Sequence, residues 1–563
     1  METTMRHIRA WIFAALAVCA ITAPTRIDAK TVDELASLCP GLTGRAIDAS
    51  IIGLPSGDGK IANAETATLT AANGERAVYC KVKATIAPVD PKSYPIEIEI
   101  NLPTNWNGKA VQYGGGGFNG VLITGLDPLR DQPPDVPPPV VRGYMTYGTD
   151  SGHEAKRLPE IQAFALNDEA LVNFAYAAYK KTRDLALVVA EQFYGRKPER
   201  LYYFGGSEGG REGLTMAQRF PNDFDGIVSI VPVINWVALQ TAGNNTGIVQ
   251  QNGGWLDAAK LALVREAVIA ACDADDGLAD GIISRYEECT EKFDPTTLRC
   301  SDGKDAGGTC LSDIQIAALV SLHSPYTFTF PLANGVRLYP GYNWGHEDQP
   351  DAMMQWVEGP KPAQFPLPDP AQQGRQWYYG NGGIRYLIAR DPSYNTLGYL
   401  PEKFRERVLE ISNLMDSTNP DLSAFQKHGG KLILKENAHD FAKSANNTIA
   451  YYKLMVVRMG QEAVDTFVRF YVNPGTAHSG AGVSGTDGTP VPRAVDLLGV
   501  LDAWVTKGDA PGTLIETAQA TEPPFKAVAT RPLCRYPGYP HYQGGPPTEA
   551  ASFACRDPAL GTR

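Results

Sequence analysis

A serine surrounded by glycines constrains the fold of this chain more than any other feature. The stretch FGGSEGGREG, Phe204–Gly213, holds five glycines, one serine and two glutamates. The residues before it, ERLYYF, are typical of a strand, and the residues after it, LTMAQRF, are typical of a helix. A turn that raises a serine above the end of a strand brings backbone so close that neighbouring side chains would collide, which explains the glycines.

The pattern G-x-S-x-G at Gly205–Gly209 matches the nucleophile elbow of α/β-hydrolases. In that elbow the N-terminus of the following helix favours developing negative charge. Glycine is abundant in this chain, so the position between strand and helix carries more weight than the pattern itself. The alternative is a phosphate-binding glycine turn, but no Lys-Ser/Thr pair follows the glycines.

Short apolar segments before and after the serine predict an α/β sheet with right-handed crossovers. Four of them resemble buried parallel strands: KAVQYGG, YMTYGTD, RLYYFGG and DGIVSIVPV. Two earlier segments, VYCKVKATI and IEIEINLP, alternate apolar and polar residues, like antiparallel strands with one open face. Residues 168–194 predict a long helix that Asn167 or Asp168 begins and Gly195 ends.

The chain of 563 residues exceeds what one compact core usually holds. The alternation of strands and helices breaks between residues 233 and 421, which are rich in Gly, Pro, Asn and aromatic residues. It resumes with two strand-like segments, KLILKEN and DTFVRFYVNPG, and with a helical segment, AVDLLGVLDAWVTKG. We therefore predict one α/β domain in two parts, 30–232 and 422–563, with a domain inserted at 233–421.

The N-terminus predicts export. Residues 1–29 combine a basic start, an apolar run and a plausible cleavage site, which is typical of a signal peptide, with a buried N-terminal helix as the alternative. We expect a secreted or periplasmic protein. Neither this run nor any later one is long enough to predict a membrane span. The net charge of −11 and the lack of a basic block argue against nucleic acid as a partner, and we expect a monomer.

Eight cysteines lie beyond the signal peptide, an even number in an oxidising compartment, which favours disulfide bonds over free buried thiols. Sequence alone does not give their connectivity. They fall, however, as four local pairs: Cys39–Cys80, Cys272–Cys289, Cys300–Cys310 and Cys534–Cys555.

A catalytic serine needs a base and an acid, which follow it in this fold in the order Ser, acid, His. His478 lies in the glycine-rich segment NPGTAHSGAG after a predicted strand, whereas His541 lies in the Pro/Gly-rich tail. We predict His478 as the base. The acid should follow KLILKEN, where Asp440 is the first candidate and Glu436 and the neighbouring His439 are competitors.

An oxyanion hole needs backbone N–H groups from two places. Glu208, directly after the serine, supplies the first. The segment QYGGGGFNG, Gln112–Gly120, is similar to the glycine-rich loop that supplies the second in lipases and esterases, here from Gly116 or Gly117. A simple glycine-rich hairpin turn is the alternative.

Taken together, these motifs resemble the tannase/feruloyl esterase family. The likeness covers nearly the whole mature chain and rests on GGGGFNG, TDSGH, GGSEGGREGLTMAQRFPNDFDGIV, GGKLIL and NPGTAHSGAG. The resemblance implies an α/β-hydrolase fold with a large inserted lid domain at 233–421. It also implies hydrolysis of small aromatic esters of galloyl, hydroxycinnamoyl or terephthalate type, without an organic cofactor.

Two departures from the family pattern matter. Relatives usually carry a bonded pair of cysteines just before the serine and just after the histidine, where this chain has Gly206 and Ser479. The family acid motif resembles H-G-x-x-D-P, whereas this chain reads ENAHDF and keeps only the aspartate, Asp440. Rival hypotheses are therefore an inactive protein that binds an aromatic ligand and an acyltransferase with the same triad.

The acidic loop CDADDGLADGIIS, residues 272–284, predicts a calcium site. It is not an EF-hand, because Gly277 takes the fifth position and Ser284 the twelfth. The resemblance implies a structural Ca²⁺ in the lid, with five ligands: the Asp273, Asp276 and Asp280 side chains and the Leu278 and Ile282 carbonyls. An acidic loop of Asx turns without a metal is the alternative.

One arginine of the inserted domain is a candidate for contact with substrate. Arg385, in GGIRYLIARDP, is able to pair with a substrate carboxylate or to form a structural salt bridge, and the sequence leaves both readings open.

Overall fold

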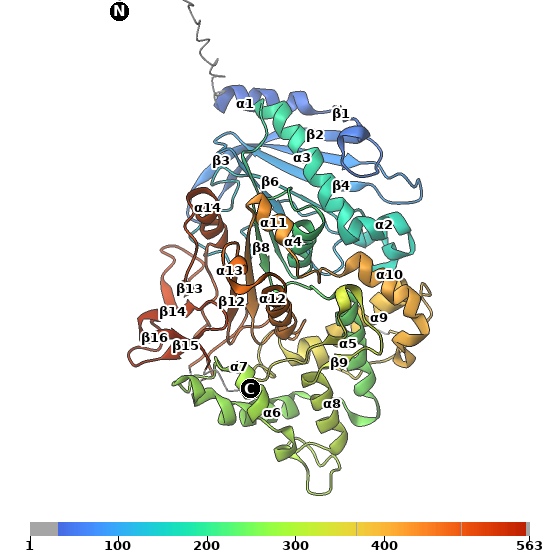
Figure 1. Ribbon diagram of the computed structural model, residues 1–563, viewed down its shortest axis with the longest axis vertical. Helices are drawn as coiled ribbons and strands as arrows, with labels where there is room; N and C mark the ends of the chain where they lie inside the picture. Colours follow the sequence, from blue (N-terminus) through green and yellow to red (C-terminus); the bar gives the residue numbers. More distant parts are fainter. Residues whose placement is uncertain (1–31, 368, 486, 559–563) are drawn as a thin grey trace, which may run out of the picture.

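The computed structural model describes residues 32–367, 369–485 and 487–558 (Figure 1). The predicted signal peptide, residues 1–29, lies outside them. The centre of the molecule is a ten-stranded sheet in the order β1-β2-β3-β4-β6-β5-β7-β8-β11-β12. Its strands are β1 (Ala46–Ile47), β2 (Gly59–Thr70), β3 (Arg76–Ile86), β4 (Ile96–Pro103), β5 (Lys109–Tyr113), β6 (Met145–Thr149), β7 (Arg200–Gly206), β8 (Gly226–Ile230), β11 (Lys431–Asn437) and β12 (Val468–Asn473).

The sheet changes from antiparallel to parallel along its width. Strands β1 to β4 and the β4–β6 pair run antiparallel, whereas β6, β5, β7, β8, β11 and β12 are parallel neighbours. All eight segments predicted as strands therefore form strands, and the six for which a sense was predicted have it. Strands β1 and β2 were not predicted, because β2 is mostly Ala, Thr, Asn and Glu and shows little alternation of apolar and polar residues.

Neighbouring residues of the parallel strands face two different cores. Tyr203 and Ile227 belong to one apolar cluster, whereas the adjacent Tyr202 and Val228 belong to another. Helices fill both sides, as a parallel sheet requires. The first cluster includes residues of α3 (Ala178–Tyr194), α4 (Glu208–Arg219) and α12 (Ala445–Met459), and the second includes Leu501 and Trp504 of α14 (Leu497–Lys507).

Two expectations need correction. The segment predicted as one helix over 168–194 is α2 (Asp168–Val172), a π-helical turn and α3, which ends at Gly195 as predicted. The expected open face of β4 is largely closed, because Glu99 and Asn101 are buried. The Asn101 amide donates to the carbonyl of Thr124 at 2.7 Å, so the loop that follows β5 covers this face.

The chain leaves the sheet after β8 and returns in β11, its neighbour in the sheet. The segment between them contributes most of a third apolar cluster, which includes Trp344, Trp356 and Leu261 and is joined by Phe118 and Phe174 from the first part of the chain. Its two ends lie side by side, because Ser417 N–H donates to the Ile234 carbonyl at 2.9 Å. Figure 1 shows α6 (Ala258–Cys272), α7 (Tyr286–Lys292) and α8 (Asp313–His323) gathered at the end of the molecule opposite β1–β4.

The remaining elements complete the chain. Those of the inserted segment are α5 (Trp236–Val249), α6 (Ala258–Cys272), α7 (Tyr286–Lys292), α8 (Asp313–His323), β9 (Tyr326–Thr327), β10 (Leu338–Tyr339), α9 (Arg375–Gly383) and α10 (Arg405–Met415). The others are α1 (Val32–Leu38), α11 (Ser423–His428), α13 (Gln461–Asp465) and two hairpins, β13 (Leu514–Gln519) with β14 (Ala527–Leu533) and β15 (Tyr539–Tyr542) with β16 (Phe553–Arg556).

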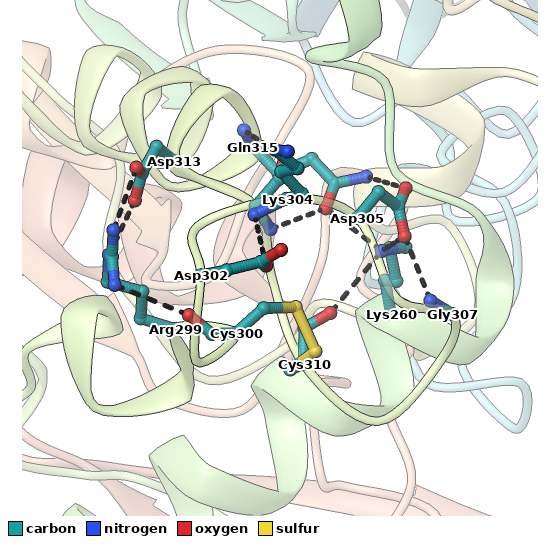
Figure 2. The surroundings of a disulfide bond; sticks show 11 residues. Lys260, Arg299, Cys300, Asp302, Lys304, Asp305, Gly307, Cys310, Asp313 and Gln315 are labelled. Atoms are coloured by element: carbon teal, nitrogen blue, oxygen red, sulfur yellow. Dashed lines mark hydrogen bonds and ion pairs between the residues drawn. A yellow bond between two sulfur atoms is a disulfide. The ribbon is translucent and has the colours of Figure 1, made fainter.

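Four disulfide bonds confirm the predicted local pairs. Figure 2 shows the surroundings of the Cys300–Cys310 bond in the inserted segment. Lys260 donates to the Asp305 carboxylate at 2.8 Å and reaches the Cys310 carbonyl at 3.3 Å, so the buried α6 side chain and the bond hold the same loop. In the described part of the chain no helix combines the length and the apolar character that a membrane crossing needs.

Candidate active site

The predicted elbow is a strained turn between β7 and α4. Ser207 has φ 59° and ψ −122°, a backbone conformation that L-residues rarely adopt. A Cβ atom on Gly205 would stand 2.2 Å from the Gly209 carbonyl oxygen, and one on Gly209 would stand 2.6 Å from the Gly115 oxygen. Glycine is therefore required on both sides of the serine, which explains the composition of the stretch.

Three predicted catalytic side chains meet above the carboxyl ends of neighbouring parallel strands. His478 Nε2 lies 3.0 Å from Ser207 Oγ, and His478 Nδ1 lies 2.7 Å from Asp440 Oδ2. These contacts give the order of a nucleophile, a base and an orienting acid. The Asp440 side chain is fully buried, whereas 12% of the His478 side chain remains exposed.

The environment of Asp440 favours its ionised form. Burial raises its pKa, but the charge and hydrogen bond of His478, the charge of Lys443 and the Ala442 N–H group outweigh burial and hold the pKa below the ordinary value. The second carboxylate oxygen accepts the Ala442 N–H at 2.7 Å and the Lys443 N–H at 3.3 Å. Backbone donors thus fix the carboxylate while its other oxygen faces the histidine.

The competing residues are engaged elsewhere. Glu436 forms a buried ion pair with Lys443, and burial raises the pKa of Glu436 to about 7. His439 Nδ1 accepts the Gly475 N–H at 2.9 Å, and burial lowers its pKa to about 3. His541 lies in β15 beside the acidic loop that contains Gly277. None of these three residues contacts Ser207 in the described structure.

The predicted oxyanion donors line the same cavity as the triad. Gly116, Gly117, Ser207, Glu208 and His478 all border a cavity of about 230 Å³. Within the described residues, no protein acceptor lies in hydrogen-bond range of the N–H groups of Glu208, Gly116 and Gly117. These groups are therefore free to donate to a developing oxyanion beside Ser207.

Aromatic side chains that the sequence did not single out form the walls of this cavity. Phe118, Trp236, Trp356 and Tyr379 border it. Phe118 stands edge-on to Trp236 with ring centroids 5.6 Å apart, and Trp356 lies 5.2 Å from the His478 ring. Such walls accept a flat apolar group. They come from three segments far apart in the chain, so no local pattern predicts them.

The motif TDSGH, Thr149–His153, supports the loop that carries the oxyanion donors. His153 is buried, and its Nε2 lies 2.9 Å from the Phe118 carbonyl oxygen. Asp150 accepts the Gly152 N–H at 2.8 Å, and burial raises its pKa to about 7. This motif was singled out only through the family resemblance, and the contact of His153 is with Phe118 of the cavity wall rather than with Ser207.

An arginine occupies the space beside Gly206, where the family usually has a cysteine. A Cβ atom on Gly206 would stand 2.6 Å from Arg130 Cδ. The guanidinium of Arg130 donates a hydrogen bond to the His478 carbonyl. Arg130 thus connects the elbow and the histidine loop without a covalent bond.

The histidine loop is also held from the inserted segment. Ser479 N–H donates to Asp351 at 2.6 Å, and the other oxygen of Asp351 accepts the indole N–H of Trp356 at 2.7 Å. The Ser479 carbonyl accepts a hydrogen bond from Arg493 at 2.7 Å. Since Trp356 also packs against His478, this segment contributes directly to the surroundings of the base.

Comparison with known proteins places this site in a family. The pattern described as "Tannase and feruloyl esterase" matches residues 80–556. The chain belongs to the tannase and feruloyl esterase family. It is 34% identical to an uncharacterised esterase of Agrobacterium fabrum, with 93% of each chain covered. It is 30% identical to the mono(2-hydroxyethyl) terephthalate hydrolase of Piscinibacter sakaiensis, covering 88% of this chain and 87% of that one.

Solved structures agree on the fold. Feruloyl esterase B from Aspergillus oryzae superposes with a TM-score of 0.73 at 22% identity, covering 93% of this chain and all of that one. The tannin acyl hydrolase of Aspergillus niger gives 0.68 at 22% identity, covering 93% of this chain and 96% of that one. The predicted α/β-hydrolase fold is confirmed, and this member of the tannase family is a carboxylic ester hydrolase.

The prediction that Arg385 contacts substrate needs correction. Its guanidinium forms a two-point ion pair with Glu160, with distances of 2.8 and 2.9 Å, and Arg385 is only 7% exposed. Arg385 stacks on Phe365 and Tyr386, and neither ring borders the cavity of this esterase. The salt-bridge reading is therefore the better one, and the sequence could not decide it because Glu160 lies 225 positions away.

The acidic loop of the inserted segment holds its carboxylates close together but turned toward backbone. The three aspartates are 5%, 3% and 8% exposed, in the order Asp273, Asp276 and Asp280. Both oxygens of Asp273 lie within 3.0 Å of Gly281 N, and the Asp276 carboxylate accepts Leu278 N–H at 3.1 Å. The Asp276 contact is an Asx turn, whereas Asp273 bridges eight residues and closes the loop.

The loop contains the kinds of oxygen atoms that bind calcium, but its carboxylates do not converge on one point. Carboxylate and carbonyl oxygens are the ligands that Ca²⁺ prefers. Asp280, however, accepts Ile282 N–H at 3.1 Å and pairs with Arg531 at 2.7 Å. Across the described residues, no three His, Cys, Asp or Glu side chains converge as they would on a metal ion.

Proposed function

We propose that this protein hydrolyses esters of aromatic acids or phenols through an acyl-enzyme formed on Ser207. The observation that carries the proposal is the continuous chain of hydrogen-bond distances, 3.0 Å from Ser207 to His478 and 2.7 Å from His478 to Asp440, at one end of an aromatic cavity. Relatives named as aromatic ester hydrolases support the same conclusion.

The geometry supports a two-step reaction. Ser207 Oγ attacks the ester carbonyl carbon as His478 Nε2 takes its proton, and Asp440 stabilises the imidazolium through Nδ1. The carbonyl oxygen, now negatively charged, is placed to receive hydrogen bonds from Glu208 N–H and from Gly116 or Gly117 N–H. His478 returns the proton to the leaving alkoxide, and a water molecule activated by His478 then releases the acid from Ser207.

A fluorophosphonate probe tests the catalytic proposal directly. We expect it to label Ser207, and labelling to disappear in Ser207→Ala and to fall sharply in His478→Ala. An unlabelled but folded wild-type protein would instead support the inactive binding protein. Product formed only with an added alcohol acceptor, and not in water, would support the acyltransferase.

We propose Arg375, rather than Arg385, as the residue that recognises a substrate carboxylate. Arg375 is exposed, and its guanidinium carbon lies 5.1 Å above the ring of Trp356, a wall of the cavity. It also lies close enough to Tyr379, another wall, to influence the pKa of that phenol. The partner of its guanidinium is the neutral side-chain amide of Gln355, at 2.6 and 3.0 Å, rather than a carboxylate. Arg375 does not itself border the cavity but stacks on one of its walls, so a carboxylate that projects outward past Trp356 would meet this cation.

Matched esters test this proposal. We expect 2-hydroxyethyl terephthalate to be hydrolysed with a higher kcat/KM than 2-hydroxyethyl benzoate, by at least about threefold because the cation is solvent-exposed. Arg375→Gln should remove the difference. Arg405→Gln is the control, since that guanidinium also stacks on an aromatic ring, Phe330 at 5.3 Å, outside the cavity. A persisting difference in Arg375→Gln, or faster turnover of galloyl or hydroxycinnamoyl esters, would contradict it.

We also propose a structural Ca²⁺ in the acidic loop and an oxidising compartment for the enzyme. Three buried carboxylates lie in one loop, and of these Asp280 pairs with Arg531 at 2.7 Å, so a cation bound there would offset the remaining negative charge. Chelator should lower the melting temperature, and added Ca²⁺ should restore it. An unchanged melting curve with no calcium by elemental analysis would retire the site.

The four disulfide bonds favour export.

A further inference from the structure

The second glutamate of the opening stretch, Glu212, has no part in the triad, yet three donors converge on it. Its side chain is fully buried in α4, at 0% exposure. One oxygen accepts the Gly115 N–H at 3.0 Å and the Tyr203 hydroxyl at 2.6 Å, and the other accepts the Asn119 amide at 2.6 Å. A carboxylate, which has acceptors only, fits three donors.

Two of those donors lie on either side of the oxyanion loop. Gly115 and Asn119 bracket Gly116 and Gly117, and Asn119 N–H closes the turn by donating to the Gly116 carbonyl at 2.8 Å. The Gly115 carbonyl accepts Gly209 N–H, also from α4, at 3.1 Å. The loop is thus docked on the helix that begins directly after Ser207.

We propose that Glu212 is a positioning residue that fixes the Gly116 and Gly117 N–H groups relative to Ser207. The inference rests on the proposed acyl-enzyme function and deepens it. Because the carboxylate belongs to the nucleophile helix, it ties both halves of the oxyanion hole to one rigid element. The third donor, Tyr203, comes from β7, and its hydroxyl donates to Glu212 rather than to the loop.

The test compares two changes to the same hydrogen-bond cluster. Glu212→Gln keeps the size of the side chain but replaces one acceptor oxygen by an NH₂ donor. In one orientation this NH₂ faces the Gly115 N–H and the Tyr203 hydroxyl, and in the other it faces the Asn119 amide. Tyr203→Phe is the matched control, because it removes one donor and leaves both loop contacts intact. We expect Glu212→Gln to lower kcat by about 100-fold, the cost of losing an oxyanion-hole donor, with KM within about threefold. Tyr203→Phe should stay within about threefold of wild type.

An inhibitor pair separates positioning from general damage. An aryl trifluoromethyl ketone adds Ser207 Oγ to its carbonyl carbon, passes the serine proton to His478 and leaves an oxyanion in the hole, whereas the product acid forms no such bond. We expect Glu212→Gln to weaken the ketone by about 100-fold and the acid by less than threefold. Equal losses for both ligands, or a kcat loss in Tyr203→Phe as large as in Glu212→Gln, would overturn the proposal.

Two further arms keep the result decisive. If Glu212→Gln does not fold, Asn119→Ala removes one contact from the loop side and should show the same selective loss. Hydrogen exchange of the backbone amides at 115–119 should be faster in either variant and unchanged in Tyr203→Phe, a readout that needs no turnover. Unchanged exchange at these amides would refute the role of Glu212. If the amides at 115–119 behaved as expected in all variants but the wild-type protein had no esterase activity, the result would count against the proposed function and not against the role of Glu212.

Discussion

Asp440→Asn should abolish most of the activity by changing which nitrogen of His478 carries the proton. In the native site one oxygen of Asp440 accepts two backbone N–H groups, at 2.7 and 3.3 Å, and the other faces His478 Nδ1 at 2.7 Å. An asparagine has one oxygen, and the backbone donors cannot turn away, so its amide nitrogen must face Nδ1. His478 then accepts at Nδ1 and holds its proton on Nε2, which points at Ser207 and can no longer take the serine proton.

The same substitution in a serine protease triad lowers kcat by about 10⁴, or roughly 5.5 kcal/mol of transition-state stabilisation. We expect a loss of that order here with KM little changed, measured with 4-nitrophenyl esters on protein whose folding is checked by circular dichroism. Glu436→Gln is the control, because Glu436 is a buried carboxylate near the triad that pairs with Lys443 instead. It should lower the melting temperature but keep kcat within about tenfold. Asp440→Asn with near-native kcat, together with a 10⁴-fold loss in Glu436→Gln, would refute the assignment.

Three further predictions concern the surroundings of the site. Burial raises the pKa of Glu358 to about 8, so the folded state binds this proton more tightly than the unfolded state and its stabilising effect is lost as pH rises from about 5 to 8. Glu358→Gln should therefore gain stability relative to wild type over that range in urea titrations, and a constant difference would contradict this sign. Replacing Cys300 and Cys310 by serine should lower unfolding stability by about 3 kcal/mol, from the chain entropy of a short loop, with kcat unchanged. Arg130→Met should lower kcat by a larger factor than it changes KM, and added guanidinium should partly restore kcat. If guanidinium does not restore kcat, Arg130 acts only through packing.

Sequence was sufficient where the determining contacts are local. The elbow could be predicted because the glycines that its turn requires lie within a few residues of Ser207, and each cysteine pair is separated by at most 41 positions. The parallel strands were visible because residues that are buried on both faces form continuous apolar runs. Chain order limited the base and the acid to a few candidates after recognisable strands, and the contacts in the structure distinguish His478 and Asp440 from the others.

Sequence was insufficient where a role depends on a distant partner. Arg375 and Arg385 lie in the same helical region, and only the position of Glu160, far back in the chain, shows which cation is already paired. Glu212 stood in the first stretch considered, but its donors Gly115 and Asn119 precede it by about a hundred residues. The acidic loop is a different case. The spacing of its aspartates does not by itself determine whether a metal ion brings their carboxylates together.

The hydrogen bond between Ser417 and Ile234 has a consequence for how this enzyme could diversify. Because the inserted segment starts and finishes at adjoining backbone positions, a chimera could receive a relative's segment through two junctions that need no rearrangement of the sheet. Evolution could likewise exchange substrate preference there while keeping Ser207 and Asp440 in place. The graft would still have to supply counterparts of Asp351 and Trp356, since these two side chains contact the loop that carries His478. The fit between the grafted segment and the loop that carries His478, rather than overall sequence similarity, would decide which chimeras are active.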